Sequence, residues 1–436
     1  MITPNNQSNL TQWIDWLLHL HADEIDLGLE RIRLVANQMQ VTKPAPFVIT
    51  VAGTNGKGST VAMLSAILIE AGYKVGTYTS PHILEFNERI QINNHAVHDQ
   101  TIVDAFASIE KQRKQTKLTY FEFSTLAALS IFKESQLDVV VLEVGLGGRL
   151  DAVNIVDADA SIITAIDVDH IDWLGDDRDQ IALEKAGVMR AGQISVCSDP
   201  KPPKTLLEFS KNLGVQFSCL SIDFTYDQTR NNDQAWLFKS LNDNESAFEF
   251  TKPALHGDFQ LQNASGVVGL LFKIQDQIPV TVEQIDSGLK KVKHPGRLDS
   301  KRINHQNWLI DVAHNPQSAM VLAGYLEKQT EQPKDRIAIF SALNDKDMLP
   351  MVQAIVPYVK TWVIADLAIP RASDLTRLKS ILISAGVDEV NITEYRSIDS
   401  AVQAVTIMPS CDVLVWGSFF TVSQALMSIK CMKGCW

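Results

Sequence analysis

The sequence predicts an α/β protein of two domains. A chain of 436 residues exceeds the usual size of one hydrophobic core. Apolar runs typical of buried strands alternate with helical patterns from residue 47, and the alternation restarts after residue 297. A glycine-rich turn follows the first strand. We therefore expect a P-loop mononucleotide-binding domain with a mainly parallel sheet over residues 1–296, and a smaller Rossmann-like α/β domain over residues 297–436.

The first elements surround this turn. Residues 10–18 and 27–35 carry apolar side chains at helical spacing and predict two short helices. The β-branched run Phe47–Ala52 predicts a buried parallel strand, after which glycines allow a tight turn. Residues 61–71 predict a helix that starts almost at once, with Gly72 placed to cap its end.

The turn itself, Gly53–Ser59, predicts a phosphate-binding loop. Backbone N–H groups and the positive end of the helix point to one place there, and Lys57 adds a full charge. The spacing departs from the usual Walker pattern, because only Thr54 and Asn55 stand between the first glycine and the Gly-Lys pair. The alternative is an ordinary glycine-rich connection with a solvated lysine. Strand, turn, lysine, hydroxyl pair and helix occur together, which favours a polyphosphate site.

Further strands and helices follow. Residues 73–82 predict a strand that ends in a polar turn, and residues 83–90 predict a loop or short strand. An apolar helix is expected over residues 120–129, followed by a central strand at Asp138–Val144. Glu143 interrupts the apolar run near the carboxyl end of that strand, where burial of a carboxylate is costly unless a cation or strong donors compensate it.

Several polar residues follow the carboxyl ends of these strands. A second glycine-rich stretch occupies residues 145–152, and His170 comes shortly after a strand predicted at residues 160–166. Because strand, helix and strand imply parallel crossovers, and ligands of open α/β sheets gather beyond the carboxyl ends, we expect these groups to converge. The expected set is the loop 53–59, Ser80, Glu143 and His170.

The rest of the chain is less uniform. Asp176 and Asp177 are placed to cap a helix that runs to residue 188. Residues 199–250 predict strands and loops of a peripheral layer, and residues 294–297 an interdomain hinge. The second domain is predicted to contain a helix that opens at residues 314–317 and strands at residues 308–313, 336–340, 361–365 and 412–416.

Candidate chemistry can be ranked by residue type. Ser59 and Glu143 offer the oxygen ligands that Mg²⁺ prefers, whereas a lone histidine such as His170 is more often a structural group or a base. Lys185 lies on a charged helix and is most simply a solvated side chain. Near Asp311, the pair His314-Asn315 either faces a ligand or forms a capped turn; its local pattern favours neither.

Composition narrows the class of protein. With 45% hydrophobic and 21% charged residues the chain is ordinary for a globular protein, and a net charge of −12 argues against nucleic-acid binding. No long apolar run or leader pattern is present, so we expect a cytoplasmic protein without membrane contact. The cysteines are scattered, fit neither a disulfide framework nor a zinc site, and are expected to be free thiols: Cys197, Cys219, Cys411, Cys431 and Cys435.

Nine short motifs follow one another along nearly the whole chain: Val51–Ser59, Thr79–His82, Tyr120–Phe123, Glu143–Ala152, Asp169–Gly175, Glu184–Gly187, Pro295–Arg297, Asp311–Pro316 and Gly417–Val422. In this order they closely resemble the folylpolyglutamate synthase and dihydrofolate synthase family, a branch of the Mur ligase superfamily. The resemblance implies an ATP-dependent ligase that activates a pteroate or folate carboxylate as an acyl phosphate and joins it to the amino group of L-glutamate.

The resemblance also implies site residues. It assigns two Mg²⁺ ions, with K⁺ as a further candidate, and magnesium ligands at Ser59, Ser80, Glu143 and His170. It implies that Lys185 is carbamylated to N6-carboxylysine, so that its anionic carbamate supports the second ion. It implies ATP contacts at Gly56, Lys57, Gly58, Ser59, Asn263, Arg297 and Asp311, with domain closure during ATP binding. Its catalytic set is Lys57, His170, Lys185 and His314.

Substrate choice follows from the same resemblance. Members that also make dihydrofolate resemble this chain at the dihydropteroate pocket, which implies a bifunctional enzyme acting on dihydropteroate and folates. The implied substrate-binding residues are Asp26, Leu27, Gly28, Thr119, Tyr120, Phe121, Glu122, Leu150, Asp151, Ala152 and Ser418.

Three other functions stay open. The first is a folylpolyglutamate synthase without the first activity. The second is a Mur-type cell-wall ligase, which would need a nucleotide-gripping domain for which residues 1–46 are short. The third is a nucleotide-dependent switch. We expect a monomer whose partners are small molecules.

Overall fold

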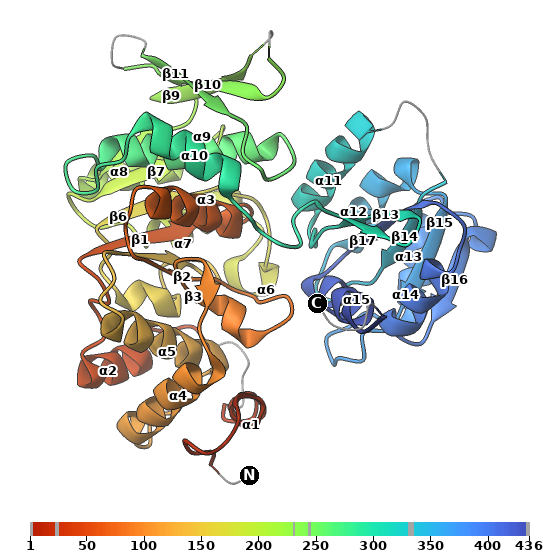
Figure 1. Ribbon diagram of the computed structural model, residues 1–436, viewed down its shortest axis with the longest axis horizontal. Helices are drawn as coiled ribbons and strands as arrows, with labels where there is room; N and C mark the ends of the chain where they lie inside the picture. The colour runs from red at the N-terminus through yellow and green to blue at the C-terminus, as the bar shows by residue number, and fades with distance from the viewer. Residues whose placement is uncertain (1–2, 22–25, 230–231, 243–245, 330–334, 433–436) are drawn as a thin grey trace. The chain divides into compact units, whose positions relative to one another are not determined.

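The computed structural model describes residues 3–21, 26–229, 232–242, 246–329 and 335–432, and the statements below concern these residues. The chain forms two compact units (Figure 1). Unit 1 contains residues 1–254 and 260–293, and unit 2 contains residues 255–259 and 294–436. The chain therefore crosses from one unit to the other at three points. The predicted boundary lay slightly later, between residues 296 and 297, and did not include the short segment 255–259.

Unit 1 is built on an eight-stranded sheet with the order β4-β3-β2-β5-β1-β6-β7-β8. The strands are β1 (Phe47–Ala52), β2 (Val75–Tyr78), β3 (Ile90–Ile92), β4 (His95–Ala96), β5 (Val139–Glu143), β6 (Ala160–Ile163), β7 (Ile194–Cys197) and β8 (Gln216–Cys219). In this spatial order, the neighbouring strands β2, β5, β1, β6, β7 and β8 are all parallel. The remaining strands, β3 and β4, pair antiparallel at the edge next to β2. The prediction of a mainly parallel sheet is thus confirmed.

Helices cover this sheet. The α-helices of unit 1 are α1 (Leu10–Leu17), α2 (Glu30–Met39), α3 (Lys57–Glu70), α4 (Asp99–Arg113), α5 (Tyr120–Glu134), α6 (Ile171–Leu174), α7 (Arg178–Ala186), α8 (Lys204–Leu213), α9 (Phe259–Lys273) and α10 (Val282–Lys291), although Phe259, the first residue of α9, belongs to unit 2. Short 3₁₀ turns, η1 (Phe86–Arg89) and η2 (Ala152–Ile155), complete the set. A separate antiparallel sheet of β9 (Phe224–Gln228), β10 (Ala235–Ser240) and β11 (Ala247–Thr251) lies beside α9 and α10 (Figure 1).

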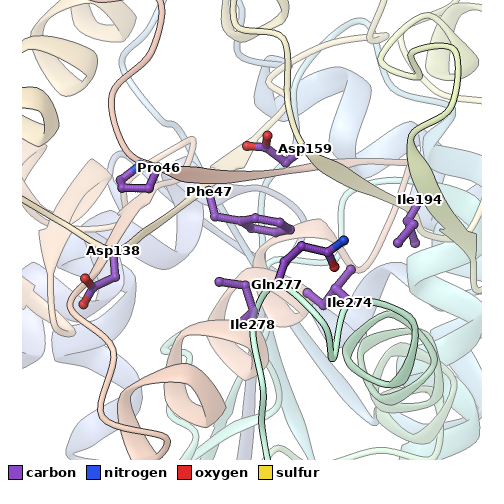
Figure 2. Close-up of a pocket in the computed structure, with 8 residues that line it drawn as sticks. All are labelled: Pro46, Phe47, Asp138, Asp159, Ile194, Ile274, Gln277 and Ile278. Carbon is purple, nitrogen blue, oxygen red and sulfur yellow. The ribbon is translucent and has the colours of Figure 1, made fainter.

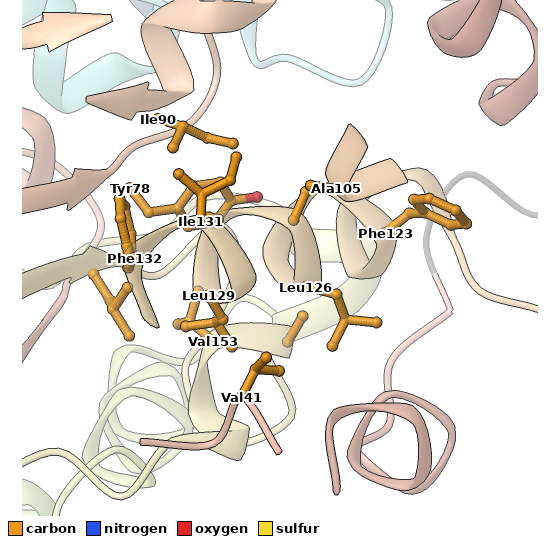
Figure 3. Packing of buried hydrophobic residues seen from close by; sticks show 14 of the residues in the cluster. Val41, Tyr78, Ile90, Ala105, Phe123, Leu126, Leu129, Ile131, Phe132 and Val153 are labelled. Atoms are coloured by element: carbon orange, nitrogen blue, oxygen red, sulfur yellow. The ribbon is translucent and has the colours of Figure 1, made fainter. Parts of the chain in front are cut away.

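A large apolar cluster lies between α5 and its neighbours (Figure 3). Phe123, Leu126 and Leu129 project from successive turns of α5 and are fully buried. Thr119 caps this helix through a capping box with Glu122, in which each side chain bonds the other residue's backbone N–H. The burial and the cap explain why the helix starts where the sequence predicts, and they fix the position of Tyr120 at its first turn.

Unit 2 contains a six-stranded sheet with the order β12-β13-β17-β14-β15-β16, parallel except for the β12–β13 pair. Its strands are β12 (Asp299–Ile303), β13 (Gln306–Ile310), β14 (Ile337–Phe340), β15 (Thr361–Ala365), β16 (Ile392–Tyr395) and β17 (Asp412–Trp416). Its helices are α11 (Pro316–Gln329), α12 (Met348–Ile355), η3 (Val356–Tyr358), α13 (Leu375–Ser384), η4 (Glu389–Asn391), α14 (Ile398–Thr406) and α15 (Phe419–Met432). This confirms the smaller Rossmann-like domain.

Some local predictions were wrong. Residues 199–250 are not a peripheral layer throughout, because α8 lies within them and β8 is the last strand of the main sheet. Residues 83–90, predicted as a loop or short strand, form a loop with the 3₁₀ turn η1, in which Glu88 accepts hydrogen bonds from preceding N–H groups, and Ile90 begins β3. The predicted strand 308–313 ends at Ile310, so Asp311 lies just beyond the sheet.

Two expectations about the whole chain can also be compared with the structure. The four cysteines in the described residues are free, and Cys435 lies outside the described part. Within the described residues, every helix is too short or too polar to cross a lipid bilayer.

Candidate active site

The glycine-rich loop connects β1 to α3 and is hydrogen-bonded to residues that follow β6. Gly53 has φ +148°, and an added Cβ would lie 1.8 Å from Oγ1 of Thr164. Thr164 donates to the carbonyl of Asn55 at 2.8 Å, and the N–H of Thr54 donates to the carbonyl of Ala165 at 2.7 Å. The loop is thus fixed by the neighbouring strand end, and α3 begins at Lys57 with its N-terminus at the loop.

Three side chains contact this loop at the start of α3. Lys57 folds back, and its Nζ donates to the carbonyls of Gly53 and Thr54 at 3.0 Å each. An added Cβ at Gly56 would lie 2.5 Å from Oδ1 of Asn263, so the predicted ATP residue on α9 does lie against the loop. Gln260, one helical turn earlier, donates to the hydroxyl of Ser59 at 3.2 Å.

Glu143 and Ser80 meet beyond the carboxyl ends of β5 and β2. The Ser80 N–H donates to Oε2 of Glu143 at 3.2 Å, and Glu143 is only 5% exposed. Val51 of β1 is the register partner of Glu143, so the carboxylate lies one strand away from the glycine-rich loop. The sequence therefore correctly predicted that these groups share one edge of the sheet.

His170 follows β6 and sits at φ +53° at the start of α6. The preceding segment is tied to the loop, because Oγ1 of Thr54 donates to the carbonyl of Asp167 at 2.8 Å. The carboxylate of Asp169 accepts the His170 N–H at 2.8 Å and thereby steadies the left-handed backbone. His170 thus belongs to the same edge of the sheet as Glu143.

The donor chemistry of Ser59, Ser80, Glu143 and His170 fits a magnesium site. Within the described residues, no three His, Cys, Asp or Glu side chains are grouped closely enough to hold a metal ion by themselves. Two hydroxyls, one carboxylate and one imidazole leave positions open for water and phosphate oxygens, which is how Mg²⁺ is usually bound beside nucleotides.

Lys185 is not the solvated side chain that its helix pattern favoured. It is 2% exposed, and burial together with the Lys57 charge lowers its pKa from 10.5 to about 7. Gly148 lies against it, since an added Cβ there would be 3.0 Å from the Lys185 Cα. Much of the amine is therefore neutral near pH 7, which is the form that reacts with carbon dioxide.

Asp151 holds the second glycine-rich stretch together. Its carboxylate accepts the N–H groups of Leu146 at 2.8 Å and Val153 at 3.0 Å. Burial raises the pKa of this carboxyl to about 6, although these hydrogen bonds and the Lys57 charge act in the opposite direction. Asp151 thus shapes the loop that contains its predicted substrate-binding neighbours, Leu150 and Ala152.

The other predicted substrate residues form a second group. Nη1 of Arg31 donates to Oδ2 of Asp26 at 2.5 Å, and Nη2 donates to Oε1 of Glu122 at 3.3 Å. Arg31 thereby links the start of the Asp26–Gly28 segment to the first turn of α5. Phe121 packs against the loop at Gly145, where an added Cβ would lie 2.7 Å from the ring. The structure thus brings the segments 26–28, 119–122 and 150–152 into one region of unit 1.

His82 and Arg89 lie beside this region and were not predicted as site residues. Nε of Arg89 donates to Nδ1 of His82 at 2.8 Å, and burial followed by the Arg89 charge lowers the pKa of His82 to about 4. The guanidinium lies 5.4 Å from the ring centre of Tyr120. The motif Thr79–His82 was visible in the sequence, but the contact with Arg89 needs the three-dimensional fold.

The predicted residues of unit 2 gather at the carboxyl ends of β13 and β17. Burial raises the pKa of Asp311, whose carboxylate accepts the N–H groups of Leu298 at 2.8 Å and Ala313 at 2.7 Å. Arg297 and His314 both lie against the ring of Phe419, at 5.2 and 5.5 Å from its centre. Phe419 was not predicted as a site residue.

Two residues of this group also have structural roles. Nδ1 of His314 lies 2.8 Å from the carbonyl of Val312, which leaves Nε2 as the acceptor of the neutral ring. Asn315 accepts the Ser318 N–H at 2.9 Å, so the capped turn is present. The hydroxyl of Ser418 accepts the Thr421 N–H at 3.0 Å and caps α15.

A cavity of about 560 Å³ lies at the opposite edge of the main sheet (Figure 2). It is lined by Pro46, Phe47, Asp138, Asp159, Ile194, Ile274, Gln277 and Ile278. Five of these residues lie at the amino ends of β1, β5, β6 and β7, and Ile274, Gln277 and Ile278 follow α9. The two carboxylates already accept backbone N–H groups, from Lys74 and Val48, at 2.8 Å each. The cavity contains none of the predicted site residues.

Comparisons with known proteins agree with this geometry. The Mur ligase middle domain matches residues 51–271, and the Mur ligase glutamate ligase domain matches residues 296–419. The fold and the loop thus define a Mur ligase.

Relatives and solved structures give the family. Dihydrofolate synthase/folylpolyglutamate synthase of Escherichia coli is 37% identical over 99% of this chain and 98% of its own length. The protein of the same name from Bacillus subtilis is 32% identical over 79% of this chain and 82% of its own length. The chain belongs to the dihydrofolate synthase/folylpolyglutamate synthase family.

Two solved structures extend over the whole fold. E. coli FolC in complex with DHPP and ADP matches with a TM-score of 0.91 and 36% identity, covering 99% of this chain and 100% of that one. The bifunctional enzyme from Yersinia pestis, complexed with AMPPNP and Mn ion, matches with a TM-score of 0.87 and 37% identity, covering 98% and 100%.

Proposed function

We propose that this chain is a bifunctional ATP-dependent ligase that joins L-glutamate first to dihydropteroate and then to folates. The observation that carries the proposal is the 37% identity to the E. coli dihydrofolate synthase/folylpolyglutamate synthase over 99% of the chain. The reaction transfers the γ-phosphoryl group of ATP to the substrate carboxylate, and the glutamate nitrogen then displaces phosphate from the acyl phosphate.

The phosphate loop supplies the first requirement, because a carboxylate and a triphosphate repel each other. Backbone N–H groups at Gly56, Gly58 and Ser59 and the start of α3 would bind the phosphates. Lys57 would leave its two loop carbonyls and neutralise the charge that develops during phosphoryl transfer. Asn263, which lies against the loop at Gly56, would contact the nucleotide from α9.

Ser59, Ser80, Glu143 and His170 would hold Mg²⁺, which supplies charge neutralisation for the phosphates when bound. The buried, partly neutral amine of Lys185 supports its conversion to N6-carboxylysine, an anion that suits a second ion. The number of metal ions, the use of K⁺ and the monomeric state are part of the same proposal.

The proposed substrate residues have two roles: some would contact the substrate, and others hold the segments that contact it. Tyr120 and Phe121 offer aromatic surface to a pterin or aminobenzoyl ring, and Leu27, Gly28, Leu150 and Ala152 belong to the flanking segments. Asp26, Thr119, Glu122 and Asp151 hold those segments through hydrogen bonds. In unit 2, Arg297 and Asp311 would contact ATP, and His314 and Ser418 would act on the reacting groups.

An assay of phosphate release tests the proposal. Purified protein with ATP and Mg²⁺ should release phosphate only when dihydropteroate and glutamate are both present, with dihydrofolate as the product. Release that is indifferent to both substrates would favour a nucleotide-dependent switch. Chromatography of the products from a reduced folate and glutamate then separates the bifunctional enzyme from a polyglutamate-only enzyme. Requirement for a nucleotide-sugar peptide would instead indicate a cell-wall ligase.

A further inference from the structure

Arg89 carries a buried positive charge that has no carboxylate partner among the described residues. It is 7% exposed, and its guanidinium makes one hydrogen bond there, from Nε to Nδ1 of His82 at 2.8 Å. The same group lies over the rings of Phe86 and Tyr120, at 5.6 and 5.4 Å from their centres. Arginine stays protonated in proteins, and a buried charge without a counter-ion is costly. The fold therefore retains a cation that its own contacts only partly compensate.

The neighbouring carboxylate, Glu88, accepts hydrogen bonds from backbone N–H groups and is not paired with Arg89. Glu88 accepts the N–H groups of Ile83 at 2.7 Å, Leu84 at 2.8 Å and Glu85 at 2.9 Å. These bonds hold the segment after His82 in a compact turn. Glu88 thus fixes the backbone before Arg89 and does not form an ion pair with its guanidinium, which lies over the aromatic rings.

Arg89 lies between the two groups of proposed site residues. Its carbonyl accepts the Thr79 N–H at 2.9 Å, and the next residue, Ser80, donates its N–H to Glu143 at 3.2 Å. Tyr120, on the other side, begins the helix that carries the proposed substrate residues. Arg89 thus links the segment that carries the proposed metal ligand Ser80 to the helix that carries the proposed substrate residues, and in the proposed reaction the substrate carboxylate would react between these two groups.

Arg89 and His82 have donor groups that make no hydrogen bond among the described residues. Arg89 keeps the N–H groups of Nη1 and Nη2, and because Nδ1 of His82 accepts from Arg89, the neutral ring carries its hydrogen on Nε2. Donors without acceptors match a ligand rich in negative oxygen. The planar fork of a guanidinium matches a carboxylate in particular.

We propose that Arg89 binds the α-carboxylate of a glutamyl folate and is a specificity residue for the second ligation. The inference rests on the proposed function. Dihydropteroate ends in the one carboxylate that reacts, whereas a glutamyl substrate carries an α-carboxylate close to the reacting γ-carboxylate. A cation beside the reacting end therefore has a partner in the second substrate that the first substrate lacks.

The test compares the two ligations in Arg89→Lys and Arg89→Gln. The KM for a reduced folate monoglutamate should rise roughly 10- to 100-fold, as expected for loss of a charge-assisted bidentate contact. The KM for dihydropteroate should change little. Equal losses for both substrates, or an unchanged KM for the folate, would overturn the proposal.

Arg113 offers a matched control. It is 8% exposed and lies 5.6 Å from the ring centre of Trp16, but its guanidinium is bonded to both oxygens of Glu110. Arg113→Gln also removes a buried arginine from an aromatic face. Because this arginine is already paired, any loss should affect both ligations equally.

A substrate analogue tests the same contact in the unmodified enzyme and does not depend on the folding of a variant. A folate monoglutamate whose α-carboxylate is replaced by a carboxamide should bind the wild-type enzyme with a KM raised by a similar factor. In Arg89→Lys the same replacement should cost much less. A wild-type KM that is indifferent to the replacement would overturn the role of Arg89. Absence of both ligations in the wild-type enzyme would instead refute the proposed function.

Discussion

At the scale of single residues, Glu143 is a buried carboxylate, which destabilises the fold unless it is compensated, and it is also a proposed metal ligand. It is 5% exposed at the end of a central strand, where a carboxylate needs compensation by donors or a cation. We predict that Glu143→Gln lowers Mg²⁺-dependent ligation by about 100-fold or more, since one anionic ligand is removed while the side-chain volume stays. Thermal unfolding should change little.

The control for this change is Glu208→Gln on the exposed surface of α8, which should leave both ligation and unfolding unchanged. Near-normal ligation by Glu143→Gln at ordinary magnesium would remove Glu143 from the metal site.

Lys185 gives a prediction of pH dependence. Its pKa of about 7 means that the neutral amine is the minor form below that pH and the major form above it. Since carbon dioxide reacts with the neutral form, carbamylation should increase as the pH rises through about 7 at a fixed carbon dioxide pressure. Labelled carbon dioxide and NMR would detect the carbamate carbon.

Lys185→Gln should lose the carbamate signal and most of the ligation activity. Partial restoration of the activity of Lys185→Ala by a small added carboxylate would support the role of the carbamate. A wild-type spectrum without a specific carbamate signal across this pH range would contradict the modification.

Residue types and spacing were enough to place Lys57, Ser80 and Glu143 at one edge of the sheet, because parallel strands end on the same side. They were not enough for Arg31, Gln260 or Arg89. Each of these acts through a partner far away in sequence: Glu122, Ser59 and the ring of Tyr120. Lys185 was misjudged for the same reason, since its burial depends on the approach of Gly148.

At the scale of elements, α3 and α10 are in close contact through Gly288. An added Cβ at Gly288 would lie 2.5 Å from the Cα of Ile67, which is backbone and cannot move aside cheaply. We predict that Gly288→Ala lowers the free energy of unfolding by about 1–3 kcal/mol. Because α3 carries the phosphate loop, nucleotide affinity should fall as well. Chemical denaturation and nucleotide titration measure the two effects.

Gly324 in α11 is the matched helical control. No heavy atom lies within 4 Å of an added Cβ there, so Gly324→Ala should stabilise its helix by about 0.5–1 kcal/mol. If Gly288→Ala and the wild-type protein have the same free energy of unfolding, α3 and α10 can move apart without loss of stability, and the prediction is wrong.

Element types were predictable where the apolar pattern is unbroken, as in β1, β5 and α5. The helix α8 was not, because Pro202 and Pro203 precede it and polar residues surround it. Its apolar side chains Leu206 and Leu207 nevertheless lie on the side that packs toward the sheet. The edge strands β12 and β16 are also partly exposed and therefore lack the continuous apolar run that identified the central strands.

At the scale of the whole molecule, unit 2 includes residues 255–259, which are separated in sequence from the rest of the unit. Phe259 packs against the core of unit 2, the rings of His256 and Tyr325 lie 6.4 Å apart, and Asp258 pairs with Lys328. We predict that cleavage at a protease site inserted between residues 293 and 294 leaves the two fragments associated during gel filtration, because fragment 1–293 retains residues 255–259.

The same cleavage in a protein that also carries Leu255→Ala and Phe259→Ala should weaken the association. Dissociation of the cleaved protein without these changes would show that segment 255–259 contributes little to unit 2.

The three crossings between the units have a consequence for protein engineering. A hybrid ligase made by splicing two genes at one junction near residue 294 would combine unit 1 of one parent with most of unit 2 of the other parent, but residues 255–259 of unit 2 would still come from the first parent. Exchange of a complete unit requires two grafts, with residues 255–259 carried as a second insert.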